Sequence, residues 1–133
     1  MKQVKLVKLP SHNDSGGNLV VAEALSKEVP FEIKRIFNVQ ATITGSIRGK
    51  HAHIDCTQLL ICTNGVIEIY CESSSESEVF KLSKPDYGLL IYPGVWSEQK
   101  YLSQNSVLTV LCDHLYDEDD YIRDYKDFKK LNN

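Results

Sequence analysis

The chain has 133 residues, of which 25% are charged and 42% hydrophobic, with a formal net charge of −3 and a pI near 5.8. This is the size of one domain with an ordinary globular composition, and the acidic balance argues against a nucleic-acid partner, which needs a basic face. No apolar run approaches the roughly 20 residues that span a bilayer, and the N-terminus lacks a signal-peptide stretch. We therefore expect a single cytoplasmic domain over 1–133, with neither nucleic acid nor membrane as a partner.

Short runs rich in Val, Ile, Leu, Tyr and Thr alternate with Gly, Pro, Asn and Ser, which is typical of all-β sandwiches and barrels. In chain order, the expected strands are 4–8, 33–39, 42–46, 57–62, 66–71, 79–82, 88–91, 96–102 and 107–113. Asn64-Gly65 predicts a tight hairpin turn, because such turns need a positive φ. The Ser-rich segment 73–77 predicts an exposed connection between strands.

The two ends of the chain read differently from this β pattern. Residues 12–18 form a turn cluster rich in Asn, Asp, Ser and Gly. The last 17 residues begin with an acidic run, 117–120, and have Lys129 and Lys130 near their end. Acid at the start and base at the end complement a helix dipole, so we expect a short C-terminal helix.

The four cysteines are Cys56, Cys62, Cys71 and Cys112, and they show no CxxC spacing. They lie mostly in apolar, strand-like surroundings. In a reducing compartment this pattern predicts free, buried thiols rather than disulfides.

The chemistry of the sequence is concentrated around His51 and His53. On a strand, residues i and i+2 point to the same face, so the two imidazoles are expected to project together. Inside a barrel such a pair is costly unless it is hydrogen-bonded, liganded or used in catalysis. The alternative is that both are partly exposed surface histidines.

The surrounding spacing matches the first cupin motif. Gly45 is followed after five residues by His-x-His, after four more by Gln58, and after six more by Gly65. The acidic ligand of the motif is thus replaced by Gln58. The turn of the second motif is present as Pro93-Gly94, but residues 95–99 contain no histidine.

These replacements predict a site with no metal. A cupin metal usually takes three histidines and a carboxylate, and two imidazoles alone hold a divalent ion weakly; Glu98 remains the one alternative carboxylate. A histidine pair without a metal suits acid–base chemistry, because its unperturbed pKa lies near neutrality. Arg48 could offer a cation to a phosphate, or could be a surface salt-bridge partner.

The sequence resembles the WxcM-like, sugar 3,4-ketoisomerase family, the TDP-4-keto-6-deoxyglucose 3,4-ketoisomerases. The matching stretches are 17–19, 29–37, 48–53 (RGKHAH), 93–96, 106–108 and 116–128, which includes DYIRDY. The resemblance implies an all-β cupin (RmlC-like) jelly-roll barrel with a short C-terminal helix, and a homodimer, with the exchange of N-terminal strands left open. It further implies a TDP-linked 4-keto-6-deoxyhexose substrate, whose keto group moves from C4 to C3 without a cofactor.

The resemblance also implies roles for individual residues. His51 carries over as the base that removes the C3 proton, with His53 as a second active-site residue and Arg48 near the nucleotide phosphates. The resemblance does not identify the acid that protonates C4, for which the sequence offers His51 itself, His53, Tyr92 and Tyr101. The substrate-binding candidates are Arg35, Arg48, Gln58, Trp96 and Ser97.

Three alternatives remain open on the sequence alone. A deoxysugar 3,5-epimerase also uses a histidine base in a cupin. A non-catalytic nucleotide-sugar-binding cupin would use the same pocket without turnover. A metal-dependent dioxygenase is the third and requires an ion at the site.

Overall fold

The computed structural model describes residues 1–131. Its strands in chain order are β1 (Val4–Lys8), β2 (Ser11–Asp14), β3 (Gly17–Val20), β4 (Arg35–Ala41), β5 (Ile47–His53), β6 (Gln58–Asn64), β7 (Ile67–Glu72), β8 (Ser77–Leu82), β9 (Tyr87–Ile91), β10 (Trp96–Tyr101), β11 (Ser106–Cys112) and β12 (Tyr121–Ile122). A 3₁₀ turn, η1 (Glu118–Asp120), precedes β12, and one helix, α1 (Tyr125–Leu131), ends the described chain. The all-β class with a short C-terminal helix is therefore confirmed.

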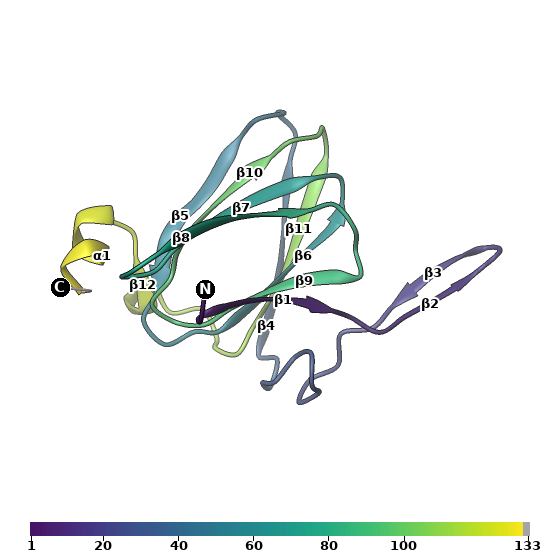
Figure 1. The fold of residues 1–133 in the computed structure, drawn as a ribbon, viewed down its shortest axis with the longest axis horizontal. Coiled ribbons are helices and arrows are strands. Elements are labelled where there is room, and N and C mark those ends of the chain that lie inside the picture. Colours follow the sequence, from purple (N-terminus) through teal and green to yellow (C-terminus); the bar gives the residue numbers. More distant parts are fainter. Residues whose placement is uncertain (132–133) are drawn as a thin grey trace.

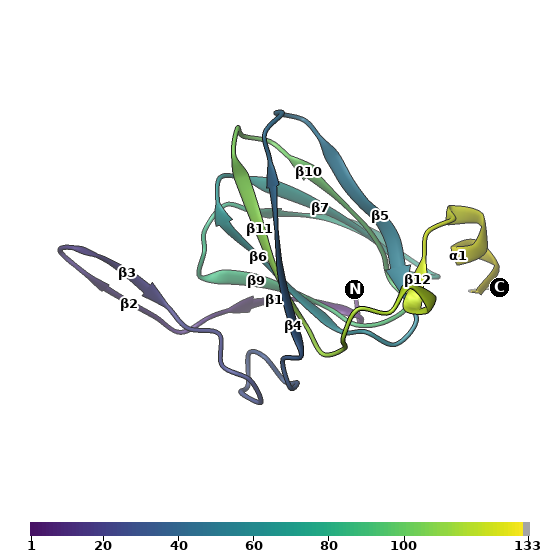
Figure 2. The same ribbon diagram turned by 180° about the vertical axis from the view of Figure 1, so that it is seen from behind.

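Two five-stranded antiparallel sheets face one another and form the body of the molecule (Figures 1 and 2). The first has the strand order β1-β9-β6-β11-β4 and the second β12-β5-β10-β7-β8. Strands that neighbour each other in a sheet often lie far apart in sequence, which is the jelly-roll arrangement. The two sheets are not joined by hydrogen-bonded strands into a closed barrel.

Strand β6 shows how the sequence builds the core. Leu60 and Cys62 point into the space between the sheets, where they join a large cluster of buried apolar side chains. Leu59 and Ile61 point the other way and pack beneath the segment that contains Val29. Both faces of β6 are buried, so the strand reads as one continuous apolar run rather than as an alternation.

The second sheet is covered on its outer face by the C-terminal segment. Ala52, Trp96, Ile122 and Phe128 form a separate buried cluster there. Glu72 accepts hydrogen bonds from the Tyr125 hydroxyl and from Lys129 Nζ, at 2.7 and 2.9 Å from its Oε2. The helix is therefore anchored by both apolar packing and charge.

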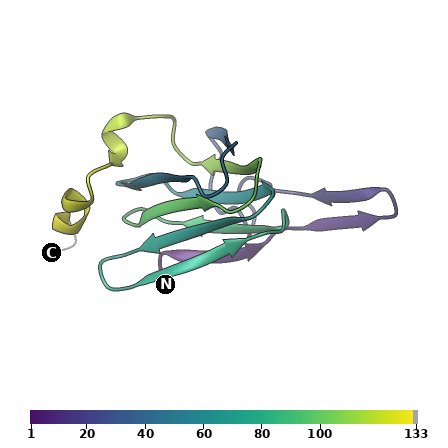
Figure 3. The ribbon, with the colours of Figure 1, turned by 90° about the horizontal axis from the view of Figure 1, so that it is seen from above.

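A hairpin of β2 and β3 projects from the end of the body opposite to α1 (Figure 3). Its two strands pair only with each other, and Asp14 Oδ1 accepts the N–H groups of Gly16 and Gly17 at 2.7 and 2.9 Å to form the turn. The sequence located this turn but not its flanking strands, because most of their side chains are exposed and carry no apolar alternation.

Two expectations about the connections are corrected. Segment 42–46 is not a strand: Gly45 has φ 89°, Ser46 Oγ donates to the Ile43 carbonyl at 2.6 Å, and Ile43 is 71% exposed. The turn at Asn64-Gly65 exists, with Gly65 at φ 86°, but it joins β6 to β7 in the opposite sheet instead of closing a hairpin. The connection at 73–77 does close the β7–β8 hairpin, as expected.

The four cysteines are free and buried, as the sequence predicted. Within residues 1–131, no helix is long and apolar enough to cross a membrane.

Candidate active site

A bulge in β5 positions the histidine pair. Across the β5–β10 ladder Ser97 lies opposite His51 and Glu98 opposite Gly49, so Lys50 is an extra residue in β5. Gly49 and Lys50 have φ values of 89° and 56°, and a Cβ at Gly49 would overlap the amide of Gln99. Bulges bend a strand and re-aim its side chains; beyond this one, His51 faces the interior.

His51 lines a cavity of about 430 Å³ between the two sheets. Both sheets and the C-terminal segment contribute to its walls, which are formed by Phe37, Val39, Ile47, Arg48, Gly49, Lys50, His51, Gln58, Leu60, Gln99, Leu108, Val110, Tyr121 and Arg123. The apolar members come mainly from β4 and β11, and the polar ones from β5, β6 and the C-terminal segment. A concave, half-apolar pocket with a few converging polar groups is typical of a small-molecule site.

The two imidazoles lie edge to face, with ring centroids 5.0 Å apart and an interplanar angle of 88°. The ring of Tyr121 lies 5.0 Å from His51 and 4.5 Å from His53. Burial, together with the neighbouring His53, lowers the pKa of His51 to about 4, and burial also lowers the pKa of His53. Both rings are therefore neutral at pH 7.

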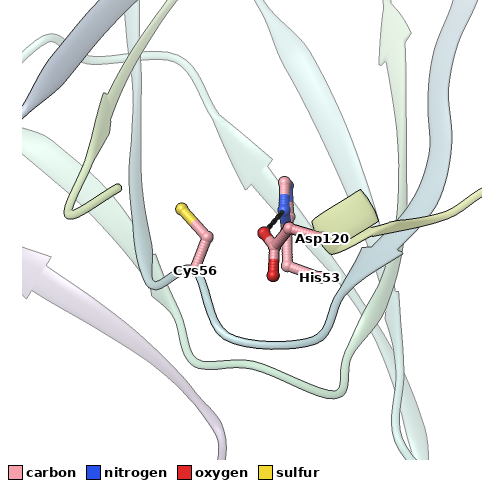
Figure 4. Close-up of side chains that lie close together, drawn as sticks. All are labelled: His53, Cys56 and Asp120. Carbon is pink, nitrogen blue, oxygen red and sulfur yellow. Dashed lines mark hydrogen bonds and ion pairs between the residues drawn. The ribbon is translucent and has the colours of Figure 1, made fainter. Parts of the chain in front are cut away.

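His53 forms a buried hydrogen bond with Asp120 (Figure 4). Its Nδ1 lies 2.7 Å from Asp120 Oδ2, whereas its Nε2 and His51 Nδ1 are buried without a hydrogen-bond partner among residues 1–131. An unpaired buried polar atom costs about 1–3 kcal/mol. Such a cost is tolerated where the atom serves a ligand or a reaction.

The same cluster offers three atoms that a cation could use. Ligand atoms of His53, Cys56 and Asp120 lie within 4.8 Å of one another. However, a hydrogen bond with Cys112, together with burial, raises the pKa of the Cys56 thiol, which disfavours the thiolate that binds metals. Asp120 is already engaged by His53 and by the Asp55 N–H. The residues present therefore fit a hydrogen-bonded cluster better than a metal centre.

Arg35 and Gln58 share a hydrogen-bond partner, the buried thiol of Cys112. The Arg35 guanidinium and the Gln58 amide donate to Cys112 Sγ at 3.6 and 3.7 Å. Hydrogen bonds from Cys56, Arg35 and Gln58 lower the pKa of Cys112. The guanidinium also lies 5.5 Å from the ring of Phe37, which lines the cavity, whereas Arg35 itself does not line it.

The remaining residues that the sequence singled out lie in different parts of the structure. Ser97 is buried opposite His51 and accepts a hydrogen bond from Gln99 at 3.4 Å. Tyr101 is fully buried in the core, and its hydroxyl has no partner within residues 1–131. Tyr92 packs on the outer face of the first sheet, and Trp96 packs under α1 on the outer face of the second. Neither Tyr92 nor Trp96 lines the cavity.

Three residues that sequence reasoning did not assign to the site reach it from the C-terminal segment: Asp120, Tyr121 and Arg123. Strand β12 pairs with β5, which brings Tyr121 opposite His53. Arg123 lies 4.3 Å from the Tyr121 ring and forms a two-point ion pair with Glu118 at 2.6 and 2.9 Å. The sequence feature that could have identified these residues is the DYIRDY motif, which begins at Asp120. Its charge pattern instead suggested the start of a helix.

The fold and the buried histidine pair define a cupin-type jelly roll with a small-molecule site. The family model "FdtA: WxcM-like, C-terminal" matches residues 2–133, and the chain belongs to this family. A curated relative, TDP-4-oxo-6-deoxy-alpha-D-glucose-3,4-oxoisomerase of Aneurinibacillus thermoaerophilus, is 37% identical over 95% of this chain and 90% of its own length.

Solved structures agree with this assignment. The sugar 3,4-ketoisomerase QdtA of Thermoanaerobacterium thermosaccharolyticum, in complex with TDP, has a TM-score of 0.93 and 35% identity, covering 98% of this chain and 94% of its own. The TDP-quinovose 3,4-ketoisomerase WlaRB of Campylobacter jejuni has a TM-score of 0.91 and 37% identity, covering 98% and 99%. The resemblance seen in the sequence is confirmed.

Proposed function

We propose that this chain moves the keto group of a TDP-linked 4-keto-6-deoxyhexose from C4 to C3. The observation that carries the proposal is the pair of buried, neutral imidazoles, His51 and His53, beside a cavity bordered by cations. The activities named for the curated relative and for two similar structures support the choice of reaction and substrate.

The reaction needs one base and no redox partner. The carbon beside a ketone is acidic because its carbanion delocalises into an enolate, so neutral His51 removes the C3 proton and leaves an enediolate. The proton returns to C4, the 3-hydroxyl proton leaves its oxygen, and the former 4-keto oxygen takes a proton. Atoms and electrons balance, since the sugar only exchanges the positions of one carbonyl and one alcohol.

The low pKa of His51 suits this cycle. Its imidazolium is a strong acid inside the cavity, so it gives the proton back to C4 readily. When the substrate binds, the negative diphosphate raises the pKa of His51 towards the working pH, because a nearby opposite charge favours the protonated form. This brings the base closer to the pKa at which general acid–base catalysis is most efficient.

Arg48 and Lys50 are the proposed contacts for the diphosphate. Both line the cavity, and neither forms an ion pair with any of residues 1–131. Arg123 is less available, because Glu118 already holds its guanidinium at two points. Gln58 reaches the cavity from the opposite sheet and is a proposed hydrogen-bond partner for the sugar oxygens.

The test is proton NMR of the protein with TDP-4-keto-6-deoxyglucose in deuterium oxide containing EDTA. We expect a 3-keto product with deuterium at C4, and no product with His51→Asn. An unchanged substrate spectrum, from a folded protein that still binds TDP, would contradict the proposal and favour a non-catalytic binding cupin. Exchange of deuterium into C5 would favour a 3,5-epimerase instead.

We further propose that the 3-keto product serves 3-amino deoxysugar biosynthesis for surface glycans. A ketone is the group that an aminotransferase converts to an amine, so a keto group at C3 sets the position of the nitrogen. The expected outcome is that adding a sugar aminotransferase, its cofactor and an amino donor consumes the new product, which mass spectrometry detects as a 3-amino sugar nucleotide.

A homodimer is also proposed. An isolated two-stranded hairpin is marginally stable in water, yet β2 and β3 project from the body with Leu19 59% exposed. A second copy that receives this hairpin would complete its packing. Light scattering should give twice the monomer mass for the full chain, and half that value after replacement of residues 11–20 by a short Gly-Ser linker.

A further inference from the structure

Within residues 1–131, Asp120 is the only carboxylate that is hydrogen-bonded to either His51 or His53. The contact joins Asp120 Oδ2 to His53 Nδ1 at 2.7 Å, with the two side chains 9% and 6% exposed. The other oxygen, Oδ1, accepts the Asp55 N–H at 2.6 Å, and the Asp120 carbonyl accepts the Ile54 N–H at 2.9 Å. The carboxylate is therefore fixed against the turn that follows β5 (Figure 4).

This geometry sets the tautomer of His53. Burial acts to raise the pKa of Asp120. The hydrogen bonds from the Asp55 N–H and from His53 lower this pKa by more than burial raises it, so the carboxyl is ionised at neutral pH. An ionised carboxylate only accepts hydrogen bonds, so the proton of neutral His53 lies on Nδ1. The lone pair of the ring then lies on Nε2.

The other ring nitrogen of His53, Nε2, is not used in a hydrogen bond within the described residues. It is buried without a hydrogen-bond partner among residues 1–131, and its ring packs against those of His51 and Tyr121. A ring with the opposite tautomer would present a donor there instead of an acceptor. Asp120 thus decides whether Nε2 is an acceptor or a donor beside His51 and Tyr121, which line the cavity, although His53 itself does not.

We propose that Asp120 is a positioning residue that holds His53 as the Nδ1–H tautomer, so that Nε2 accepts a hydrogen bond from a sugar hydroxyl next to the keto carbon. The proposal rests on the ketoisomerase function proposed above. Asp120 itself does not touch the substrate; it acts through His53. The acceptor is needed while the hydroxyl becomes a carbonyl, so its loss should lower kcat more than it raises KM.

The variant Asp120→Asn tests this directly. The backbone N–H of Asp55 can be accepted only by the amide oxygen of the new side chain, which turns its NH₂ group towards His53 Nδ1. Nδ1 must then accept, and the proton moves to Nε2. We expect long-range ¹⁵N–¹H correlation spectra to show Nδ1 protonated in the wild type and Nε2 protonated in the variant, with kcat lower by about 10²-fold and KM little changed.

The chain contains a matched control in Asp113. Its Oδ1 accepts the Thr57 N–H at 2.8 Å and also lies 2.6 Å from Nδ1 of the exposed His114. Asp113→Asn therefore removes a carboxylate charge beside a histidine outside the cavity, but it does not force the tautomer of His114 to invert, because the amide oxygen can keep both contacts. We expect Asp113→Asn to retain the wild-type kcat. We also expect the double variant His53→Asn, Asp120→Asn to be no slower than His53→Asn alone, because Asp120 acts only through that ring.

Two results would overturn the proposal: an Nε2-protonated His53 in the wild type, or an unchanged kcat in an Asp120→Asn variant whose tautomer has inverted. The wild-type spectrum decides the first even if the variant fails to fold. Absence of turnover by the wild type would instead overturn the proposed function, while the tautomer measurement would still report on Asp120.

Discussion

Residues 1–131 contain two histidine–aspartate pairs with nearly equal nitrogen–oxygen distances but different surroundings. His53 Nδ1 lies 2.7 Å from Asp120, and His114 Nδ1 lies 2.6 Å from Asp113. Each aspartate also accepts a backbone N–H. The pairs differ in exposure: the side chains are 6% and 9% exposed in the first, and 47% and 22% in the second.

This difference reverses the sign of the pKa shift. Burial lowers the pKa of His53 even though Asp120 acts to raise it, whereas the hydrogen bond with Asp113 raises the pKa of exposed His114. The desolvation of the charged form outweighs the partner in one case and not in the other. A contact with an aspartate therefore does not by itself set the direction of a histidine's pKa shift; the burial of the ring decides it.

The largest predicted effect separates the site histidines from the surface one. His51→Asn should lower kcat by about 10²- to 10⁴-fold, because it removes the general base, while TDP affinity, measured by calorimetry, stays within about 3-fold. His114→Asn should leave kcat unchanged. Equal losses in the two variants would mean that the cavity is not the catalytic centre.

The next effect is on stability at acid pH. The pKa of His51 is about 4 when folded and 6.5 by its ordinary value, so between these values the unfolded chain binds a proton that the folded chain does not. Stability is therefore lost as the pH falls through this window. Between pH 7 and 4.5, urea unfolding should show that the wild type loses roughly 2 kcal/mol more than His51→Asn, after allowance for partial solvent screening. Parallel curves would contradict a depressed pKa.

A smaller effect is the difference between the pKa values of the histidines in the two histidine–aspartate pairs. The His114 ring should titrate above 6.5 and the His53 ring below it, which a ¹H–¹⁵N titration measures directly. The stability that His114 contributes is present below 6.5 and is lost as the pH rises through its folded pKa. Asp113→Asn should bring the His114 pKa back towards its ordinary value, and an unchanged value would show that the hydrogen bond is not formed in solution.

The smallest expected effect is that of metal removal. The cluster of His53, Cys56 and Asp120 is geometrically compact, but its bonding favours hydrogen bonds over an ion. Dialysis against EDTA should leave kcat within about 2-fold of the untreated protein. A loss of activity that added zinc or iron restores would assign the cluster to a metal instead.

Expectations that depended on local pattern were largely confirmed. Strand β1 has the predicted bounds, and β6, β7, β9, β10 and β11 fall within two residues of theirs, because apolar runs bounded by turn residues are local signals. The strand predicted at 42–46 does not form, because its local signal has no support from the tertiary structure. Its Thr and Ile residues favour a strand, but no neighbouring strand or core covers Ile43, so the turn at Gly45 determined the backbone.

The residue pattern was enough to predict the β class, the free thiols and the histidine pair, and RGKHAH and DYIRDY were enough to predict the family. Spacing along one strand was enough to place His51 and His53 side by side, because the side-chain period of a strand is fixed. Which other groups reach these two histidines depends on how the strands are arranged in space. Tyr121 and Asp120 arrive through the pairing of β12 with β5, whereas Trp96, one residue before Ser97, turns away to pack under the helix. Contacts between residues so distant in sequence depend on sheet order and strand register, which no local pattern encodes.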